Sequence, residues 1–148
     1  AEITRKELIL ALVASGTTPR LAGVNLSALD MTRIDMSGAN LRGANMQAAT
    51  LRESIMRNAN MPFVDMSVVQ AVGLDLDGAN LTGSNLSGAN LQAARLTNAN
   101  LTNVTLNGAN LQGANMKSAN INGIKFDEKT TWPDGKKGSQ ANPADYTK

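Results

Sequence analysis

Two short segments contain residue types that could bind an ion or a phosphate. The segment 75–78 (DLDG) resembles part of a calcium loop, but the glutamate expected later in an EF-hand is absent. The segment 135–139 (GKKGS) resembles part of a phosphate-binding loop, without its first glycine or the flanking strand and helix. We interpret the first segment as a surface turn with an additional acid and the second as a charged turn.

The remaining residue types argue against catalysis. The chain has no His and no Cys, so the commonest general base, the thiol nucleophile and most transition-metal ligands are missing. Ser and Thr are numerous, but none has an evident activating partner. We therefore predict no catalytic residue, no metal ligand, no cofactor and no small-molecule substrate, and we expect that the protein is not an enzyme.

A group of arginines could attract nucleic acid or an acidic protein. No aromatic residues interleave with them, as binding of a single strand would require, and two of them have an acidic residue 20 positions later. We interpret them as solvated surface and expect no nucleic-acid partner. The group consists of Arg33, Arg42, Arg52 and Arg57.

The elements that must position any site follow a five-residue period. Every fifth position from Leu21 to Phe126, 22 positions in all, has a large apolar residue, with Ala71 as the one exception. We call this residue the centre of its repeat. A period of five fits neither a helix nor a flat strand, so the backbone must change direction once per repeat. The pattern predicts a solenoid.

The other positions of the repeat have separate roles. The residue two before the centre is Ala in 11 of 21 repeats, so both can point inward from a short extended stretch. The residue just before the centre is Asn in 11 repeats and Asp in four, and the residue two after it is Gly in 10. That last position fits the third residue of a type II turn, which requires a positive φ.

Blocks such as 79–83 (ANLTG), 89–93 (ANLQA) and 109–113 (ANLQG) resemble the A(D/N)LXX motif of the pentapeptide repeat family. The resemblance covers about 107 of the 148 residues. It implies an all-β solenoid, namely a right-handed quadrilateral β-helix with four pentapeptides, or 20 residues, per coil. The repeats would then form about 5.5 coils and a rod about 26 Å long at strand spacing.

Charged residues provide a separate indication of the coil length. In a 20-residue coil, residues n and n+20 lie over one another, and opposite charges are expected there. A 15-residue coil would place Arg33 over Ala48 instead. Three oppositely charged pairs have the 20-residue spacing: Arg33 and Glu53, Arg57 and Asp77, and Asp75 and Arg95.

Both ends of an open solenoid need caps. We predict a capping helix and linker in 1–20, the β-helix in 21–127, and a C-terminal cap with an irregular tail in 128–148. Thr4 and Glu7 fit a capping box, followed by an apolar stripe in 8–13 that is too short to span a membrane. The segment around Trp132 resembles one that follows the last coil in cyanobacterial members of the family, and we expect Trp132 to cover the open core.

The repeat departs most from its pattern in 53–72, where outward positions hold apolar residues. Such residues could form a partner surface. The alternative is local packing, because Phe63 would lie between Gly43 and Gly83 of the neighbouring coils. The candidate partner residues are Ile55, Pro62, Phe63, Val68 and Val72.

These features predict a non-enzymatic pentapeptide repeat protein that is a protein–protein interaction scaffold with an unknown protein partner. It is similar to cyanobacterial and plastid members without an assigned activity. The alternative, suggested by relatives that protect gyrase, is a DNA mimic that binds a type II topoisomerase. Mimicry requires a strongly negative surface, whereas 21–126 holds seven basic and six acidic residues.

The assembly and compartment are less constrained by the sequence. We expect a monomer rather than a dimer, and no membrane span. We expect a cytoplasmic protein, or one of the thylakoid lumen or periplasm if a leader has been removed before Ala1.

Overall fold

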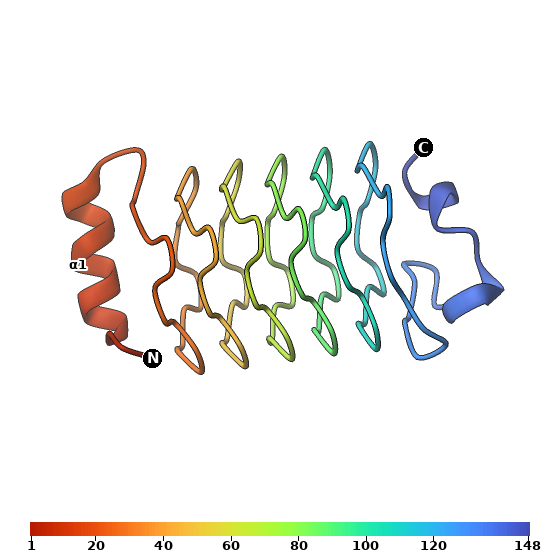
Figure 1. Cartoon of the computed structure of the whole chain (residues 1–148), viewed down its shortest axis with the longest axis horizontal. Coiled ribbons are helices and arrows are strands. Elements are labelled where there is room, and N and C mark those ends of the chain that lie inside the picture. The colour runs from red at the N-terminus through yellow and green to blue at the C-terminus, as the bar shows by residue number, and fades with distance from the viewer.

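The computed structural model describes all 148 residues and has the shape of an elongated stack of coils with helical segments at its two ends (Figure 1). The α-helix α1 spans Arg5–Ser15 at the N-terminal end. Two 3₁₀ turns, η1 (Gly138–Gln140) and η2 (Pro143–Tyr146), lie at the other end. Between them the chain pairs through isolated single-residue bridges, so no longer strand is present.

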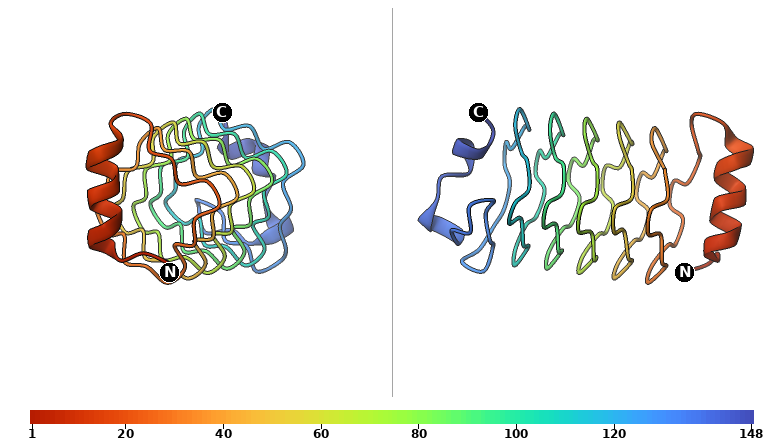
Figure 2. Two further views of the ribbon diagram at one scale, coloured as in Figure 1. Left: turned by 60° about the vertical axis from the view of Figure 1, so that its left-hand side comes forward. Right: turned by 180° about the vertical axis from the view of Figure 1, so that it is seen from behind.

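Each coil contains 20 residues. The parallel bridges join each residue before a centre to its counterpart in the next coil, from Arg20 with Asn40 to Thr105 with Lys125. The bridges recur every five residues, so one coil holds four repeats and four turns. Figure 2 shows the successive coils lying over one another along the long axis.

The turns have the backbone conformation that the glycine pattern predicts. In most repeats the amide three residues after a centre donates to the carbonyl of that centre, as Ala44 does to Leu41 at 2.9 Å. The residue two after the centre has a positive φ in every repeat from Gly23 to Gly123. Ten of these residues are glycines and eleven have a side chain.

The interior is a single apolar cluster. It contains 39 buried hydrophobic residues, and Leu81 and Leu101 at the centres of inner repeats are fully buried. Ser54 and Ser84 replace the usual alanine two before the centre, and each hydroxyl donates to a backbone carbonyl of the preceding coil. The buried hydroxyls are therefore satisfied.

The predicted charge pairs form only in part. Arg33 contacts Glu53 at 2.6 Å, as expected for a 20-residue coil. Arg57, however, contacts Asp75 at 2.5 Å instead of Asp77. The carboxylate of Asp77 accepts hydrogen bonds from a threonine and an asparagine of the next coil, and this occupies it. The predicted pair of Asp75 with Arg95 is also absent, because Asp75 contacts Arg57 and Arg95 donates to the Thr97 hydroxyl. The ladder has the 20-residue spacing, but two of the three predicted charge pairs were wrong.

The helix α1 lies across the N-terminal end of the stack (Figures 1 and 2). Thr4 accepts from the amide of Glu7 while the Glu7 carboxylate accepts from the amide of Thr4. Leu8 is fully buried against the first coil. Ile9 and Val13 of the predicted stripe are 39% and 78% exposed, because only one line of α1 contacts the coil.

The coil register continues beyond Phe126, where the sequence analysis ended it. Asn110 pairs with Thr131 at a spacing of 21 residues, so one residue is inserted after Phe126 and the ladder then resumes. Trp132 occupies the centre of this further repeat and is fully buried. The amide of Gly135 donates to the carbonyl of Trp132 at 2.9 Å and closes the turn.

The C-terminal segment, with the short turns η1 and η2, packs on the last coil. The Tyr146 ring stacks on Trp132 at 5.8 Å, and the Phe126 ring meets Trp132 edge-on at 5.1 Å. The Tyr146 hydroxyl donates to Asp134 at 2.7 Å, and the amide of Ser118 donates to the carbonyl of a residue near the C-terminus. Aromatic stacking and these hydrogen bonds order a segment whose composition is polar.

Candidate functional site

The large exposed apolar side chains lie in two regions. One region is the outer side of α1, with Ile9, Leu10 and Val13. The other is the middle of the stack, where the repeat pattern is broken. The second region was expected from the sequence, whereas most of the first was expected to be buried.

The five candidate partner residues do not form one patch. Ile55, Phe63, Val68 and Val72 belong to four successive repeats of a 20-residue coil, so they are spread around the stack. Phe63 and Val68 lie at the two turns that border the side of bridge residue Asp65, whereas Ile55 and Val72 belong to the repeats before and after. Pro62 is buried, Val72 is half-buried, and Ile55 is 36% exposed. Phe63 and Val68 are the most exposed, at 58% and 48%, and they lie in adjacent repeats. We refer to these two residues and the groups they touch as the Phe63–Val68 surface.

Phe63 lies at the turn position where glycine is the most frequent residue. Its φ is +60°, and Pro62 precedes it at the turn position where proline is favoured. The ring covers Gly83 of the next coil so closely that a Cβ there would lie 2.6 Å from a ring atom. The guanidinium of Arg42 lies 5.3 Å from the ring centroid, within reach of a cation–π contact. The ring is therefore held from two sides while its outer part stays exposed.

Ser84 holds the turn beneath Phe63. In this turn the amide of Val64 does not donate directly to the carbonyl of Met61. It donates to the Ser84 hydroxyl at 3.0 Å, and that hydroxyl donates to the Met61 carbonyl at 2.8 Å. The hydroxyl is thus a bridge within the turn. Ser84 was not identified from the sequence. The available signal was a polar residue at a position that, Ser54 apart, holds apolar residues, 20 residues after Val64.

Val68 occupies the equivalent position of the next repeat with a φ of +50°. A β-branched residue in this region is an outlier, because its side chain collides with the backbone. Its Cγ1 would lie 3.0 Å from a Cβ on Gly88, so the side chain leans over that glycine. Both exposed residues therefore fold partly over small neighbours, as the local-packing alternative proposed, yet about half of each side chain remains accessible.

Three acidic side chains of the neighbouring coils, Glu53, Asp75 and Asp77, are engaged by ion pairs or hydrogen bonds. The Arg33 guanidinium, through its hydrogen bond, holds the pKa of Glu53 below its usual value. The hydrogen bond from Thr97 likewise lowers the pKa of Asp77. Both carboxylates of the calcium-like segment 75–78 are therefore engaged, Asp77 as described and Asp75 by its contact with Arg57.

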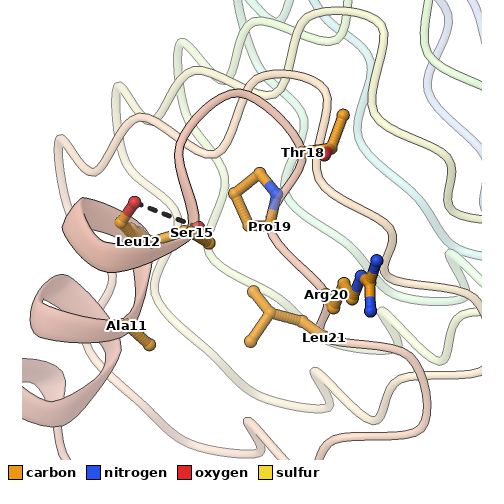
Figure 3. A pocket seen from close by; sticks show the side chains of 7 residues that line it. All are labelled: Ala11, Leu12, Ser15, Thr18, Pro19, Arg20 and Leu21. Carbon is orange, nitrogen blue, oxygen red and sulfur yellow. Dashed lines mark hydrogen bonds between the residues drawn. The ribbon is translucent and has the colours of Figure 1, made fainter.

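The hollows of the molecule lie away from the Phe63–Val68 surface. A cavity of about 320 Å³ between α1 and the first coil is lined by seven residues of 11–21 (Figure 3). In it, the Ser15 hydroxyl donates to the carbonyl of Leu12 at 3.1 Å. Another hollow, of about 230 Å³, is lined by polar residues including Arg95 and Lys117. The Phe63–Val68 surface projects outward, which suits a macromolecular partner better than a small ligand.

Two further findings concern sites of other kinds. No group of three or more acidic, His or Cys side chains is brought together in a way that could hold a metal ion. No helix has the length and apolar character needed to cross a membrane.

A profile for pentapeptide repeats matches the chain in eight copies over residues 20–58, 69–98 and 94–128. A pentapeptide repeat protein (Rfr23) from the cyanobacterium Cyanothece 51142 is 31% identical over 86% of this chain and 99% of its own, with a TM-score of 0.46. One from the thylakoid lumen of Arabidopsis thaliana is 25% identical over 88% of this chain and 86% of its own, with a TM-score of 0.51. QnrB1, a plasmid-mediated fluoroquinolone resistance protein, is 18% identical over 75% and 67%, with a TM-score of 0.34. Among curated proteins, none matches the chain.

Proposed function

Because this chain belongs to the pentapeptide repeat family, we propose that it is a non-enzymatic scaffold that binds a protein partner through Phe63 and Val68. The observation that carries the proposal is the exposure of both side chains at turn positions with a φ of +60° and +50°. Aromatic and aliphatic side chains that remain exposed on a rigid element are typical anchors for a partner.

The backbone conformation supports this proposal. A side chain in the left-handed region costs roughly 1–2 kcal/mol, which glycine avoids. Glycine occupies ten of the equivalent positions in this chain, so the repeat readily accepts it. Strained residues that persist where a relaxed alternative exists are a reason to look for function. Val68 is the clearest example, since it is β-branched.

The contacts around the Phe63 turn also support the proposed binding role. The Ser84 bridge and the Arg42 contact both hold Phe63 in one orientation. A side chain that is already fixed loses less entropy when a partner binds. We infer that Ser84 and Arg42 position the anchor, and that neither need touch the partner.

We also propose that the coil is a right-handed quadrilateral β-helix capped by α1 and by the segment after Phe126. The 20-residue ladder and the capping box support this proposal. We propose a monomer in the cytoplasm, with the thylakoid lumen or periplasm as the alternative compartments. The monomer is supported by the small area of α1, the other exposed apolar element, which has only 11 residues.

Affinity capture tests the proposed function. Wild-type protein and the variant Phe63→Ser/Val68→Ser are immobilised and exposed to an extract of the source organism, and a captured protein is then purified and titrated directly. A matched control, Leu10→Ser/Val13→Ser, removes apolar side chains on α1 that are at least as exposed. We expect the first variant to lose the partner and the control to keep it. Equal capture by all three proteins would rule out this binding surface.

Mimicry of duplex DNA receives less support. Duplex DNA presents one negative charge for about every 1.7 Å of its axis. The repeat region 21–126 instead holds seven basic and six acidic residues. Titration of purified gyrase with this protein is the direct test, and we expect no tight binding.

A further inference from the structure

Two asparagines of this chain precede a glycine, Asn107 and Asn122. In such a pair the glycine nitrogen can attack the side-chain amide carbon, because glycine presents no side chain to block the approach. Both asparagines are exposed and both occupy the first corner position of a turn. The two pairs therefore share sequence, turn position and exposure, and they differ in what the glycine nitrogen contacts.

The Gly108 amide, which follows Asn107, is engaged. Inner glycines at this position donate to a carbonyl of the next coil, as Gly43 does to Pro62 at 3.0 Å. At Gly108 the inserted residue after Phe126 has shifted the next coil, and the amide donates to the Asp127 carboxylate at 2.9 Å. This hydrogen bond is the main reason that the pKa of Asp127 lies below its usual value.

The Gly123 amide, which follows Asn122, has no hydrogen-bond partner. Its repeat belongs to the last coil, and no further coil covers this side to supply a carbonyl. The turn around it is closed by Ile124 donating to Ile121 at 3.2 Å, which is longer than the 3.0 Å of the corresponding bond after Asn107. The nitrogen at Asn122 is thus the less restrained of the two.

We propose that Asn122 is a site of spontaneous deamidation and that Asp127 protects Asn107 from the same reaction. The Gly123 nitrogen forms a bond to the Asn122 side-chain carbon, loses its proton to water, and ammonia leaves to give a succinimide. Water then opens the ring at either carbonyl, which produces aspartate or isoaspartate. The sequence consumes one water and releases one ammonia, so it needs no oxidant, reductant or enzyme.

The position of the site in the stack makes its product tolerable. Isoaspartate inserts an additional carbon into the backbone and would disturb the five-residue register of an inner coil. At Asn122 no coil lies above, so the change reaches one neighbouring coil instead of two, through the Asn122 carbonyl that accepts from the Asn103 amide at 2.8 Å. The modification also adds a negative charge beside the C-terminal cap. This inference is independent of the proposed partner surface.

Peptide mapping tests the proposal directly. The full chain is incubated at neutral and mildly alkaline pH, digested with trypsin, and analysed for the mass change from amide to carboxylate. Cleavage after Lys117 and Lys125 places Asn122 in the peptide 118–125 and Asn107 in a separate one. We expect Asn122 to convert about tenfold faster or more, the factor that one ordinary hydrogen bond supplies. Equal rates, or faster conversion of Asn107, would overturn the proposal.

Two controls isolate the structural cause. In denaturant both Asn-Gly pairs lose their folded surroundings, so their deamidation rates should converge. A difference that persists in denaturant would show that the neighbouring sequence, and not the fold, sets the rates. The variant Asp127→Ala should raise the rate at Asn107 towards that at Asn122. Should this variant fail to fold, amide hydrogen exchange in the wild-type protein replaces it, with Gly108 expected to exchange more slowly than Gly123. Similar exchange at both glycines would contradict the protective role of Asp127.

Discussion

At the level of single residues, several turn corners have a side chain although the backbone conformation there favours glycine. Eleven corners have a residue other than glycine at positive φ. Asparagine, which tolerates this region, occupies three of them, at Asn58, Asn98 and Asn103. Val68 and Phe63 are bulky, so their retention cannot be attributed to local backbone preference.

Replacing Val68 by glycine should stabilise the protein. The left-handed strain is removed and little packing is lost, because the side chain is 48% exposed, so we expect the free energy of unfolding to rise by about 1 kcal/mol. Ala93→Gly, at an equivalent corner with a φ of +56°, is the matched control and should change stability less. Equilibrium denaturation measures both, and a clear destabilisation by Val68→Gly would contradict the strain argument.

Replacing Ser84 by alanine should weaken the Phe63 turn. The alanine fits, since most repeats have it, but the Val64 amide and the Met61 carbonyl lose their bridge. We expect a loss of about 1–3 kcal/mol in unfolding free energy, and weaker partner binding. Ser54→Ala is the control. The Ser54 hydroxyl also donates to a turn carbonyl, that of Met31, but this turn keeps its direct hydrogen bond from the Ile34 amide to the Met31 carbonyl at 3.2 Å. Equal effects of the two variants on binding would argue against a specific role for Ser84.

Sequence reasoning at this level reached the candidate residues but not their arrangement. The exposure of Phe63 and Val68 followed from the register alone. The four-repeat coil implied by the resemblance spreads the candidate residues around the stack, and only Phe63 and Val68 lie at the two turns that border one side. The Ser84 bridge depends on a contact across 20 residues that no local pattern encodes.

At the level of elements, the repeat was predictable and the ends were less so. The five-residue period and the glycine positions predicted the turns. The capping box of α1 was visible in Thr4 and Glu7, whereas the exposure of Val13 depended on how α1 lies across the coil. The further repeat centred on Trp132 was missed because a single inserted residue after Phe126 interrupts the five-residue period.

The C-terminal segment should show a distinctive alkaline transition. Burial, and then the hydrogen bond to Asp134, raises the pKa of Tyr146 from its ordinary value of 10.0 to about 12. A raised pKa in the folded state stabilises the segment below pH 10, and this contribution is lost as the pH rises through about 12.

The absorbance of the phenolate follows this titration without ambiguity, because Tyr146 is the only tyrosine. The variant Asp134→Asn removes a nearby negative charge and should lower the midpoint. Fluorescence of Trp132, on which the Tyr146 ring stacks, reports whether the segment detaches in the same pH range. A midpoint at the ordinary value in the wild-type protein would show that Tyr146 is not packed as described.

At the level of the whole molecule, the stack behaves as one apolar core enclosed by a hydrogen-bonded ladder. Its 94 backbone hydrogen bonds mostly join successive coils or close turns. Apolar side chains fill the interior, and the outer sides repeat regularly. Specific recognition of a partner therefore has to come from positions that depart from the repeat. This is why the two exposed residues in the middle of the stack carry the functional proposal.

Truncation of an inner centre should affect the whole stack. Leu81→Ala leaves a cavity in the middle of the core, so we expect a loss of about 2–5 kcal/mol in unfolding free energy. Leu10→Ala, at a side chain that is 59% exposed on α1, should cost far less. Denaturation followed by circular dichroism and by Trp132 fluorescence measures both variants, and similar small losses would indicate that the centres are not the core.

The most direct test of the account combines stability and binding in one variant, Phe63→Gly/Val68→Gly. We expect this variant to be at least as stable as wild type in equilibrium denaturation, because the left-handed strain is relieved. We also expect that it no longer captures the partner from an extract of the source organism. If the variant bound its partner as wild type does, the strained side chains would have no role in recognition and the proposed binding surface would be wrong.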